Sequence, residues 1–202
     1  GLSSTEKGEN VYNDKGMLTR LICHFWDDDD TYKWYETIDY VFDYDAHGNK
    51  ILSEYYQKID ADSPREGRSK NVYRYNAMRQ IIYEEYFKFK NGAWTNNTKK
   101  YFTFSPTGKS TSYTEYGWHD DMWSGVKRDS TVYNTDDRPK MQIDYRWHRN
   151  EKDWKLWDLT EYEYTSHDSI NTEIKRFYHY RYNEMTPSHF TAKASGPNYS
   201  SI

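Results

Sequence analysis

The sequence lacks several features on which other classes of protein depend. It has a single cysteine, Cys23, among 202 residues, so no internal disulfide can form. No apolar run approaches the roughly 18 residues that a membrane-spanning helix needs. The formal net charge is only −4, and Lys and Arg are interspersed with Asp and Glu. Because phosphate binding needs clustered cations, this pattern argues against a nucleic-acid partner.

Leu, Ile, Val and Phe are also scarce, at less than the roughly one fifth of the chain below which disorder is usually expected. The sequence instead contains 22 Tyr and 8 Trp, and each buried aromatic removes roughly 150–250 Å² from water. Disordered chains are poor in aromatics. Residues that favour strands dominate the apolar runs, whereas the helix formers Ala and Leu are few. The composition therefore predicts an aromatic-rich, all-β fold.

An aromatic residue followed by a turn recurs every 29 to 32 residues. The anchors of this repeat are Tyr12, Tyr44, Tyr75, Phe104, Tyr133 and Tyr164. Trp stands ten residues before four of them, as Trp34, Trp94, Trp123 and Trp154, while Leu2 and Arg65 hold that place in the other two units. Asn, Asp, Ser or Thr follows each anchor, and Gly fills the fifth turn position three times. These are residues of tight turns.

Each unit of about 30 residues therefore predicts two strands and two turns. Strands joined by short turns are antiparallel neighbours, so we expect an up-and-down meander of about 11 to 13 strands. We expect one domain over 1–182, formed by a curled or partly open sheet. Each unit would be stabilised by contacts with its neighbouring units, as in solenoid proteins. A wide closed β-barrel is the alternative, because closure removes edges. Residues 183–202 break the pattern and predict an irregular tail.

The ten-residue offset also predicts which side chains share a face. Side chains alternate along a strand, so an even offset places Trp and its anchor on the same face unless a bulge intervenes. In 154–164 that face would carry Trp154, Leu156, Asp158, Thr160, Tyr162 and Tyr164.

The segment FDYDAHGNKI (42–51) resembles the Tyr-Asp-x-x-Gly core of the tyrosine-aspartate (YD) repeat proteins. The chain is also similar to short secreted proteins of gut anaerobes that are classed as domains of unknown function. The likeness covers about residues 10–180, although Arg79, Asp137 and Asp168 stand where the turn Gly is expected. The resemblance implies a hairpin-repeat sheet, an exported bacterial location and no chemistry. A chain that starts at Gly1 also favours export with the targeting segment removed.

Several polar motifs are candidates for metal or catalytic sites. The run DDDD (27–30) lacks the Gly and distal Glu of a calcium loop, so a solvated turn is expected. The pairs His47 and His167, and His119 and His148, hold equivalent turn positions and predict surface residues, not zinc ligands. We therefore expect no metal and no cofactor. An acid recurs directly before an aromatic residue in four units, as Glu54, Glu85, Glu115 and Asp144. Because a catalytic site occurs once in a chain, this regular recurrence favours a structural role.

The sequence thus predicts a non-catalytic exported scaffold or binding module that engages glycan or protein through aromatic rows. The candidate ligand-binding residues are Trp34, Trp94, Trp123, Trp154, Tyr44, Tyr75, Tyr133 and Tyr164. Two alternatives remain open: a carbohydrate-active enzyme that uses a carboxylate pair from the recurring acids, and a purely structural segment with internal aromatics. The sequence does not indicate the oligomeric state.

Overall fold

Every regular element in the computed structural model is a β-strand. The structure describes residues 6–27, 33–58, 62–167, 170–181 and 184–195. The strands are β1 (Glu6–Tyr12), β2 (Leu18–Asp27), β3 (Lys33–Tyr44), β4 (Lys50–Gln57), β5 (Glu66–Tyr75), β6 (Ile81–Lys90), β7 (Ala93–Phe104), β8 (Ser110–His119), β9 (Met122–Tyr133), β10 (Pro139–His148), β11 (Asp153–His167), β12 (Ile170–Arg181) and β13 (Glu184–Ser195). The described residues include no helix that is long and apolar enough to cross a membrane.

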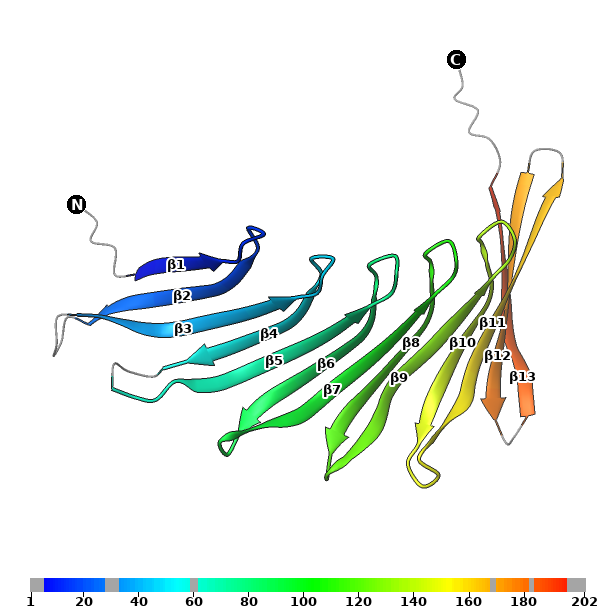
Figure 1. Cartoon of the computed structure of the whole chain (residues 1–202). Coiled ribbons are helices and arrows are strands. Elements are labelled where there is room, and N and C mark those ends of the chain that lie inside the picture. Colours follow the sequence, from blue (N-terminus) through cyan, green and yellow to red (C-terminus); the bar gives the residue numbers. More distant parts are fainter. Residues whose placement is uncertain (1–5, 28–32, 59–61, 168–169, 182–183, 196–202) are drawn as a thin grey trace, which may run out of the picture. The chain divides into compact units, whose positions relative to one another are not determined.

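The thirteen strands form one sheet in chain order, with β1 and β13 at its two edges (Figure 1). This confirms the expected antiparallel meander and its strand number. Because β1 pairs with β2 and β13 with β12, the sheet is not closed into a barrel. β13 lies within the segment 183–202 for which an irregular tail was expected, so residues 184–195 form an edge strand instead.

The turn after each of the first five anchors is built by the residue that follows it, whereas β11 continues past Tyr164 to His167. In the first such turn the Asn13 side chain accepts hydrogen bonds from the amides of Lys15 and Met17, both at 3.0 Å. Asp45, Asn76 and Asn134 repeat the pattern in later turns. The fifth position is left-handed in every described case, as Gly16, Gly48, Arg79, Gly108 and Asp137. Glycine adopts this conformation without the Cβ clash that other residues meet.

A β-bulge lies three residues after the Trp position in four of the units. Cys23 pairs with Ile38 and His24 with Glu36, which leaves Thr37 as the extra residue. The same shift leaves Arg68 in β5, Val126 in β9 and Trp157 in β11 without a directly opposite partner. One extra residue reverses the alternation of side chains beyond it. The expectation that Trp and anchor share a face was therefore wrong.

A second bulge lies seven residues after the anchor, at Thr19, Ile51, Ile82 and Lys140. The anchor tyrosine of the following unit bonds to the backbone beside it. The Tyr44 hydroxyl donates to the carbonyl of Leu18, and the Tyr75 hydroxyl donates to that of Lys50, both at 2.8 Å. A bulge disrupts the ladder of backbone hydrogen bonds locally, so these hydroxyls satisfy a carbonyl next to the disruption.

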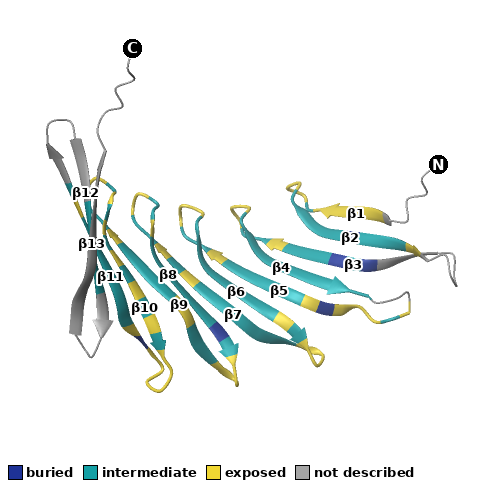
Figure 2. Ribbon diagram, turned by 180° about the vertical axis from the view of Figure 1, so that it is seen from behind, coloured by how far each residue is buried: buried dark blue, intermediate teal, exposed yellow. Residues whose placement is uncertain are grey.

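The sheet forms a single layer. The chain divides into a first unit, Gly1–Lys100, and a second unit, Tyr101–Ile202. Contacts between elements of the described residues run between consecutive strands, apart from a few between β9 and β11. Among described residues only Ile22 and Trp154 are buried hydrophobic side chains, and most others are half-buried (Figure 2). Stability therefore comes from neighbour-to-neighbour packing on the two faces.

Candidate functional site

The register of β8 to β11 sorts the side chains of the second unit onto two faces. Residues directly opposite each other share a face, and Trp118 pairs with Trp123 while Trp147 pairs with Trp154. Following the pairing across both bulges gives one apolar face, which we call the Trp face. It carries Tyr116, Trp118, Trp123, Arg128, Val132, Met141, Ile143, Tyr145, Trp147, Trp154, Leu156, Leu159, Glu161 and Glu163, together with small polar residues.

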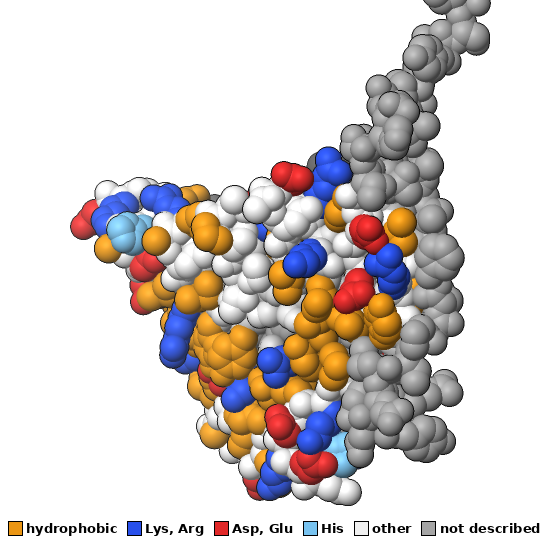
Figure 3. All heavy atoms as spheres, turned by 90° about the vertical axis from the view of Figure 1, so that its right-hand side faces the viewer, with side chains coloured by type: hydrophobic (Ala, Val, Ile, Leu, Met, Phe, Trp, Pro, Cys, Tyr) orange, Lys and Arg blue, Asp and Glu red, His pale blue; other side chains and the backbone are white. Residues whose placement is uncertain are grey.

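The opposite face of the same strands, which we call the polar face, carries most of the charges. Its residues include Glu115, Lys127, Asp129, Asp144, Arg146 and Asp158. Without the bulge in β11, Asp158 would lie beside Leu156 and Leu159 would face the charges. The bulge thus separates apolar from charged side chains. Figure 3 shows one side of the molecule, where hydrophobic side chains gather and charged side chains lie among and around them.

Three aromatic rings form a cluster on the Trp face. The centroids of Tyr116 and Trp147 lie 5.9 Å apart, and those of Trp147 and Trp154 lie 5.2 Å apart, all in edge-to-face contact. Trp154 is only 9% exposed, and its indole N–H donates to the Tyr116 hydroxyl at 3.1 Å. The rings lie over Gly125, where an added Cβ would come within 2.5 Å of Trp154. The close fit requires glycine at this position.

The first unit repeats this arrangement around Trp94. Its ring contacts Phe89 and Tyr56 edge to face, with centroids 5.1 and 6.0 Å away. Beneath it lies Gly67, where a Cβ would fall 2.9 Å from the indole. In both units, the indole of one hairpin therefore covers the glycine of the preceding hairpin. Edge-to-face pairs of this kind contribute about 0.5–1.5 kcal/mol beyond area burial.

The structure divides the predicted ligand-binding residues into separate groups. Trp94, Trp123 and Trp154 pack against neighbouring aromatics, and Trp34 lies outside the residues whose side chains are described. The anchor tyrosines do not join them, because the bulge places anchor and Trp on opposite faces. The hydroxyls of Tyr44, Tyr75 and Tyr133 bond to backbone carbonyls, and Tyr164 stacks on Tyr162.

A buried ion cluster in the first unit was missed by sequence reasoning. Asp39 is 1% exposed, and Arg20 donates to both of its carboxylate oxygens at 2.8 and 2.9 Å. Arg65 also pairs with Asp39, and its guanidinium lies 3.8 Å from the centroid of the Tyr56 ring. Burial, followed by the hydrogen bond to Glu54, raises the pKa of Tyr56 to about 12.

The signal for this cluster was present in the sequence. Arg65 occupies the place that Trp holds in other units, and Asp39 occupies the place of Lys70 and Arg128. The two exceptions compensate each other, since the arginine covers Tyr56 as the indole would and neutralises the aspartate. A planar guanidinium can stack on an aromatic ring while it pairs with a carboxylate.

The recurring acids lie in different surroundings and on different faces. Glu54 pairs with Lys70 at 3.1 Å, while Glu85 and Glu115 accept hydrogen bonds from tyrosines at 2.6 Å. Within each unit these acids lie two strands apart, which corresponds to about 10 Å between backbones. The bulges place Glu54 and Glu85 on the Trp-bearing face of the first unit and Glu115 and Asp144 on the polar face of the second.

Asp144 stands between two other aspartates in one cross-strand row. Its direct partners are Asp129 in β9 and Asp158 in β11. Burial and then these two charges raise the pKa of the Asp144 carboxyl, while Lys127 opposes the shift. A shallow hollow of about 310 Å³ beside the row is lined by Lys127, Asp129, Thr131, Gln142 and Asp144, among others. Like charges directly opposite each other destabilise a sheet, so this row is a cost to the fold.

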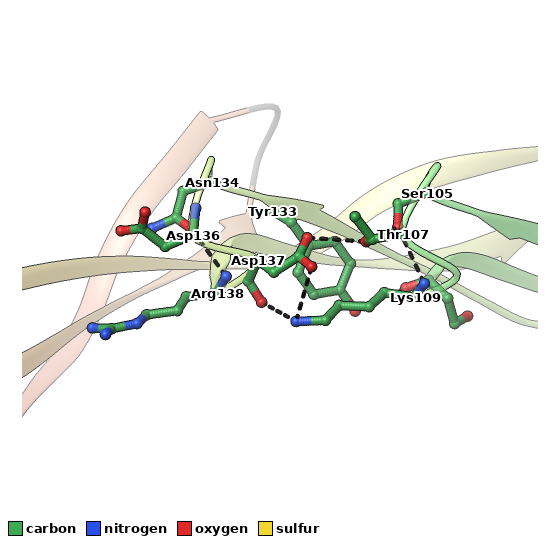
Figure 4. A network of polar contacts seen from close by, with 9 residues as sticks. Ser105, Thr107, Lys109, Tyr133, Asn134, Asp136, Asp137 and Arg138 are labelled. Carbon is green, nitrogen blue, oxygen red and sulfur yellow. Dashed lines mark hydrogen bonds and ion pairs between the residues drawn. The ribbon is translucent and has the colours of Figure 1, made fainter.

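Successive anchor turns of the second unit are joined by polar contacts (Figure 4). The Thr107 hydroxyl donates to the Asp137 carboxylate at 3.0 Å, and the Lys109 ammonium donates to the Asp137 carbonyl. These bonds explain why an aspartate is tolerated at a left-handed position, where φ is 60°. They connect two hairpins and leave no converging set of reactive groups.

The motifs considered for metal binding give no site in the described part of the chain. No group of three or more His, Cys, Asp or Glu residues is placed there to hold an ion. His47, His119 and His148 are exposed. His167 lies among residues whose side chains are not described, and most of the DDDD run (27–30) lies outside the described residues.

Comparisons with known proteins show likeness at the level of structure. No protein-family model matches the chain, and no curated protein matches it, so the YD-repeat resemblance depends on the 42–51 motif. A protein of unknown function from Bacteroides fragilis is 15% identical, with a TM-score of 0.45, over 64% of this chain and 94% of that one. A DUF3836 family protein from Bacteroides vulgatus is 12% identical, with a TM-score of 0.22, over 61% and 97%. A porin-like protein from Bacteroides uniformis is 11% identical, with a TM-score of 0.28, over 96% and 91%.

Proposed function

We propose that this chain is a non-catalytic binding module, built from hairpin repeats, that engages a protein partner through the Trp face of the second unit. The observation that carries the proposal is the separation of apolar and charged side chains onto opposite faces of a one-layer sheet. Folded domains normally bury an apolar sheet face against a second layer. In the described residues no second layer covers this one.

The size of the Trp face supports an interaction role. Four strands of about 4.8 Å and four same-face rows of about 6.7 Å cover about 19 Å by 27 Å, or about 500 Å². The largest apolar patch on a typical monomer is about 300–600 Å² and is often functional. Val132 is 47% exposed, and Ile143, Leu156 and Leu159 are half-buried.

A protein partner fits this face better than a glycan. Sugar binding uses exposed ring faces beside hydrogen-bonding groups, whereas Trp147 and Trp154 direct their rings at each other and at Tyr116. The polar side chains that would bind hydroxyl groups lie mostly on the opposite face. The centre of the Trp face is aliphatic, and aliphatic side chains pack against other apolar side chains.

The non-catalytic part of the proposal is supported by the arrangement of the acids. Glu54, Glu85 and Glu115 are each engaged by a tyrosine hydroxyl or a lysine. A glycoside hydrolase holds two carboxyl groups about 5–9 Å apart on either side of a bound sugar. Asp129 and Asp144 instead line a shallow hollow that is open to solvent. Exported location stays a prediction from the sequence.

The experiment uses an apolar dye and a glycan array on the same protein. We expect bis-ANS fluorescence to rise on the wild-type chain in dilute solution and the array to stay blank. Ile143→Lys, at the centre of the Trp face, should lower dye binding. Gln142→Lys, the adjacent residue on the polar face, is the matched control and should leave it unchanged.

Three results would contradict the proposal. Dye binding that responds equally to both lysine variants would show that the Trp face is not the apolar surface. Glycan binding that is lost in Trp147→Ala would make the face a sugar platform. Turnover of a glycoside that is abolished by Asp144→Asn alone would make the protein an enzyme.

A further inference from the structure

The charges on the Trp face are few. Among the described residues of β8 to β11 this face carries one cation, Arg128, and two acids at its margin, Glu161 and Glu163. Arg128 is directly opposite Tyr145, one row before Ile143 and one strand to one side of it. Glu161 is directly opposite Met141, one row after Ile143 and one strand to the other side. Ile143 therefore lies midway between a cation and an anion.

We propose that the occupant of the Trp face is a second copy of this chain, packed face to face about a two-fold axis near Ile143. This inference rests on the proposed function and names its partner. A two-fold interface uses the same patch on both copies. Every contact between two different residues is therefore formed twice, once in each direction. An axis that lies in the interface at right angles to the Arg128–Glu161 line brings each Arg128 opposite the other copy's Glu161.

The local contacts of the two charged residues are compatible with this pairing. The Arg128 guanidinium lies 4.5 Å from the centroid of the Tyr145 ring, which holds its side chain over the face. Glu161 accepts a hydrogen bond from the Tyr178 hydroxyl at 3.0 Å. Arg176, directly opposite Glu161 on β12, forms its ion pair with Glu163 at 2.6 Å.

The area agrees with a modest homodimer. A patch of about 500 Å² on each copy gives about 1,000 Å² in total, near the lower limit for a specific interface. An apolar centre with polar groups at the margin is the usual composition of such an interface. The dimer would also supply each sheet with the second layer that the described chain lacks.

The edges of the sheet disfavour the other route to self-association. Pairing of free edge strands would join sheets side by side, and natural proteins block it with charges and proline. The edge strand β1 reads EKGENVY, with three charges in seven residues. The other edge strand, β13, contains Pro187, which has no backbone N–H to donate.

The test is sedimentation equilibrium of the full chain over a wide concentration range. We expect a reversible monomer–dimer equilibrium. Ile143→Lys should weaken it at least about tenfold, because it buries a charge at the centre of the interface. Gln142→Lys, on the polar face, should leave it within about twofold, and circular dichroism would verify that both variants keep the fold.

Charge reversal tests the geometry itself. Arg128→Glu and Glu161→Arg should each weaken the dimer about tenfold, because each places like charges in contact twice. The double variant restores both pairs and should bring the dissociation constant back to within about threefold of wild type. If the two reversals add instead, the proposed two-fold arrangement is wrong.

The outcomes separate this inference from the proposed function. A chain that stays monomeric at every concentration while bis-ANS still responds to Ile143→Lys would overturn the homodimer and leave a different protein as the partner. A monomer with no selective dye response would overturn both. A dimer that resists Ile143→Lys would place the interface elsewhere.

Discussion

Replacing Gly125 with alanine tests the packing of indole rings over glycine. The new Cβ would lie 2.5 Å from Trp154 Cζ2 and 2.6 Å from Trp147 Cε3, whereas carbon atoms in contact are normally about 3.5–4.0 Å apart. Neither ring can yield freely, because each packs against the other and against Tyr116. The clash therefore has to displace the whole cluster.

The magnitude follows from three contributions. Overpacking of this kind costs about 1–3 kcal/mol, and loss of the hydrogen bond from Trp154 to Tyr116 adds about 1 kcal/mol. Alanine in place of glycine recovers about 0.5–1 kcal/mol of backbone entropy. We expect Gly125→Ala to lower the free energy of unfolding by about 2 kcal/mol, measured by urea denaturation, with a red shift of indole emission.

Two control experiments test this prediction. Gly8 lies in β1, and a Cβ added there would meet no heavy atom within 4 Å, so Gly8→Ala should be neutral or slightly stabilising. Trp154→Leu removes one of the two rings that meet the new methyl, so its combination with Gly125→Ala should cost less than the sum of the two. Equal effects of Gly125→Ala and Gly8→Ala, or strict additivity of the double variant, would refute the packing argument.

Three further predictions concern charges and turns. Asp39→Asn should lower the free energy of unfolding by about 3 kcal/mol, because it leaves Arg20 and Arg65 without their shared buried carboxylate; a loss below about 1 kcal/mol would show that the cluster matters little. Arg79→Gly should raise the melting temperature, since it relieves a left-handed residue at a cost of about 1 kcal/mol; an unchanged or lower value would contradict this. The folded state raises the pKa of Asp144, so its charge destabilises the fold above that pKa, and the cost disappears as the pH falls below the unfolded value of 3.8. Asp144→Asn should therefore stabilise the chain at pH 7 and lose that advantage near pH 3, as chemical denaturation at both pH values would show.

The meander could be predicted from the sequence because its determinants are local. Asn13 and its equivalents build the turns through their own side chains, and the left-handed fifth position explains the recurring glycines. Short turns then leave only antiparallel neighbours. Each of these steps depends on residues within a few positions of one another, so periodicity alone was sufficient.

The faces could not be predicted, because bulges depend on pairing between strands. Nothing in the segment from Trp154 to Tyr164 marks Trp157 as the extra residue. Its position becomes evident only when Asp144 is seen opposite Asp158 and Tyr145 opposite Leu156. A single extra residue moves every later side chain of the strand to the other face of the sheet. The strands were therefore predicted correctly, but the neighbours of the anchor tyrosines were not.

The candidate site was predicted in part for the same reason. The tryptophans were expected to share a face with the anchors of their own strands. The actual partners, Tyr116 for Trp154 and Tyr56 for Trp94, come from other hairpins. Glycine two residues after the Trp position, as in Gly125, was the available signal, since a strand glycine often marks the close approach of another group.

The central claim is that the bulge in β11 sorts apolar and charged side chains onto opposite faces, and methyl NOE spectroscopy tests it most directly. The bulged register predicts contacts from Leu156 methyls to the Tyr145 ring and from Leu159 methyls to Ile143, because these pairs lie directly opposite each other. Leu159 methyls that contact Gln142 instead, with no NOE to Ile143, would contradict it.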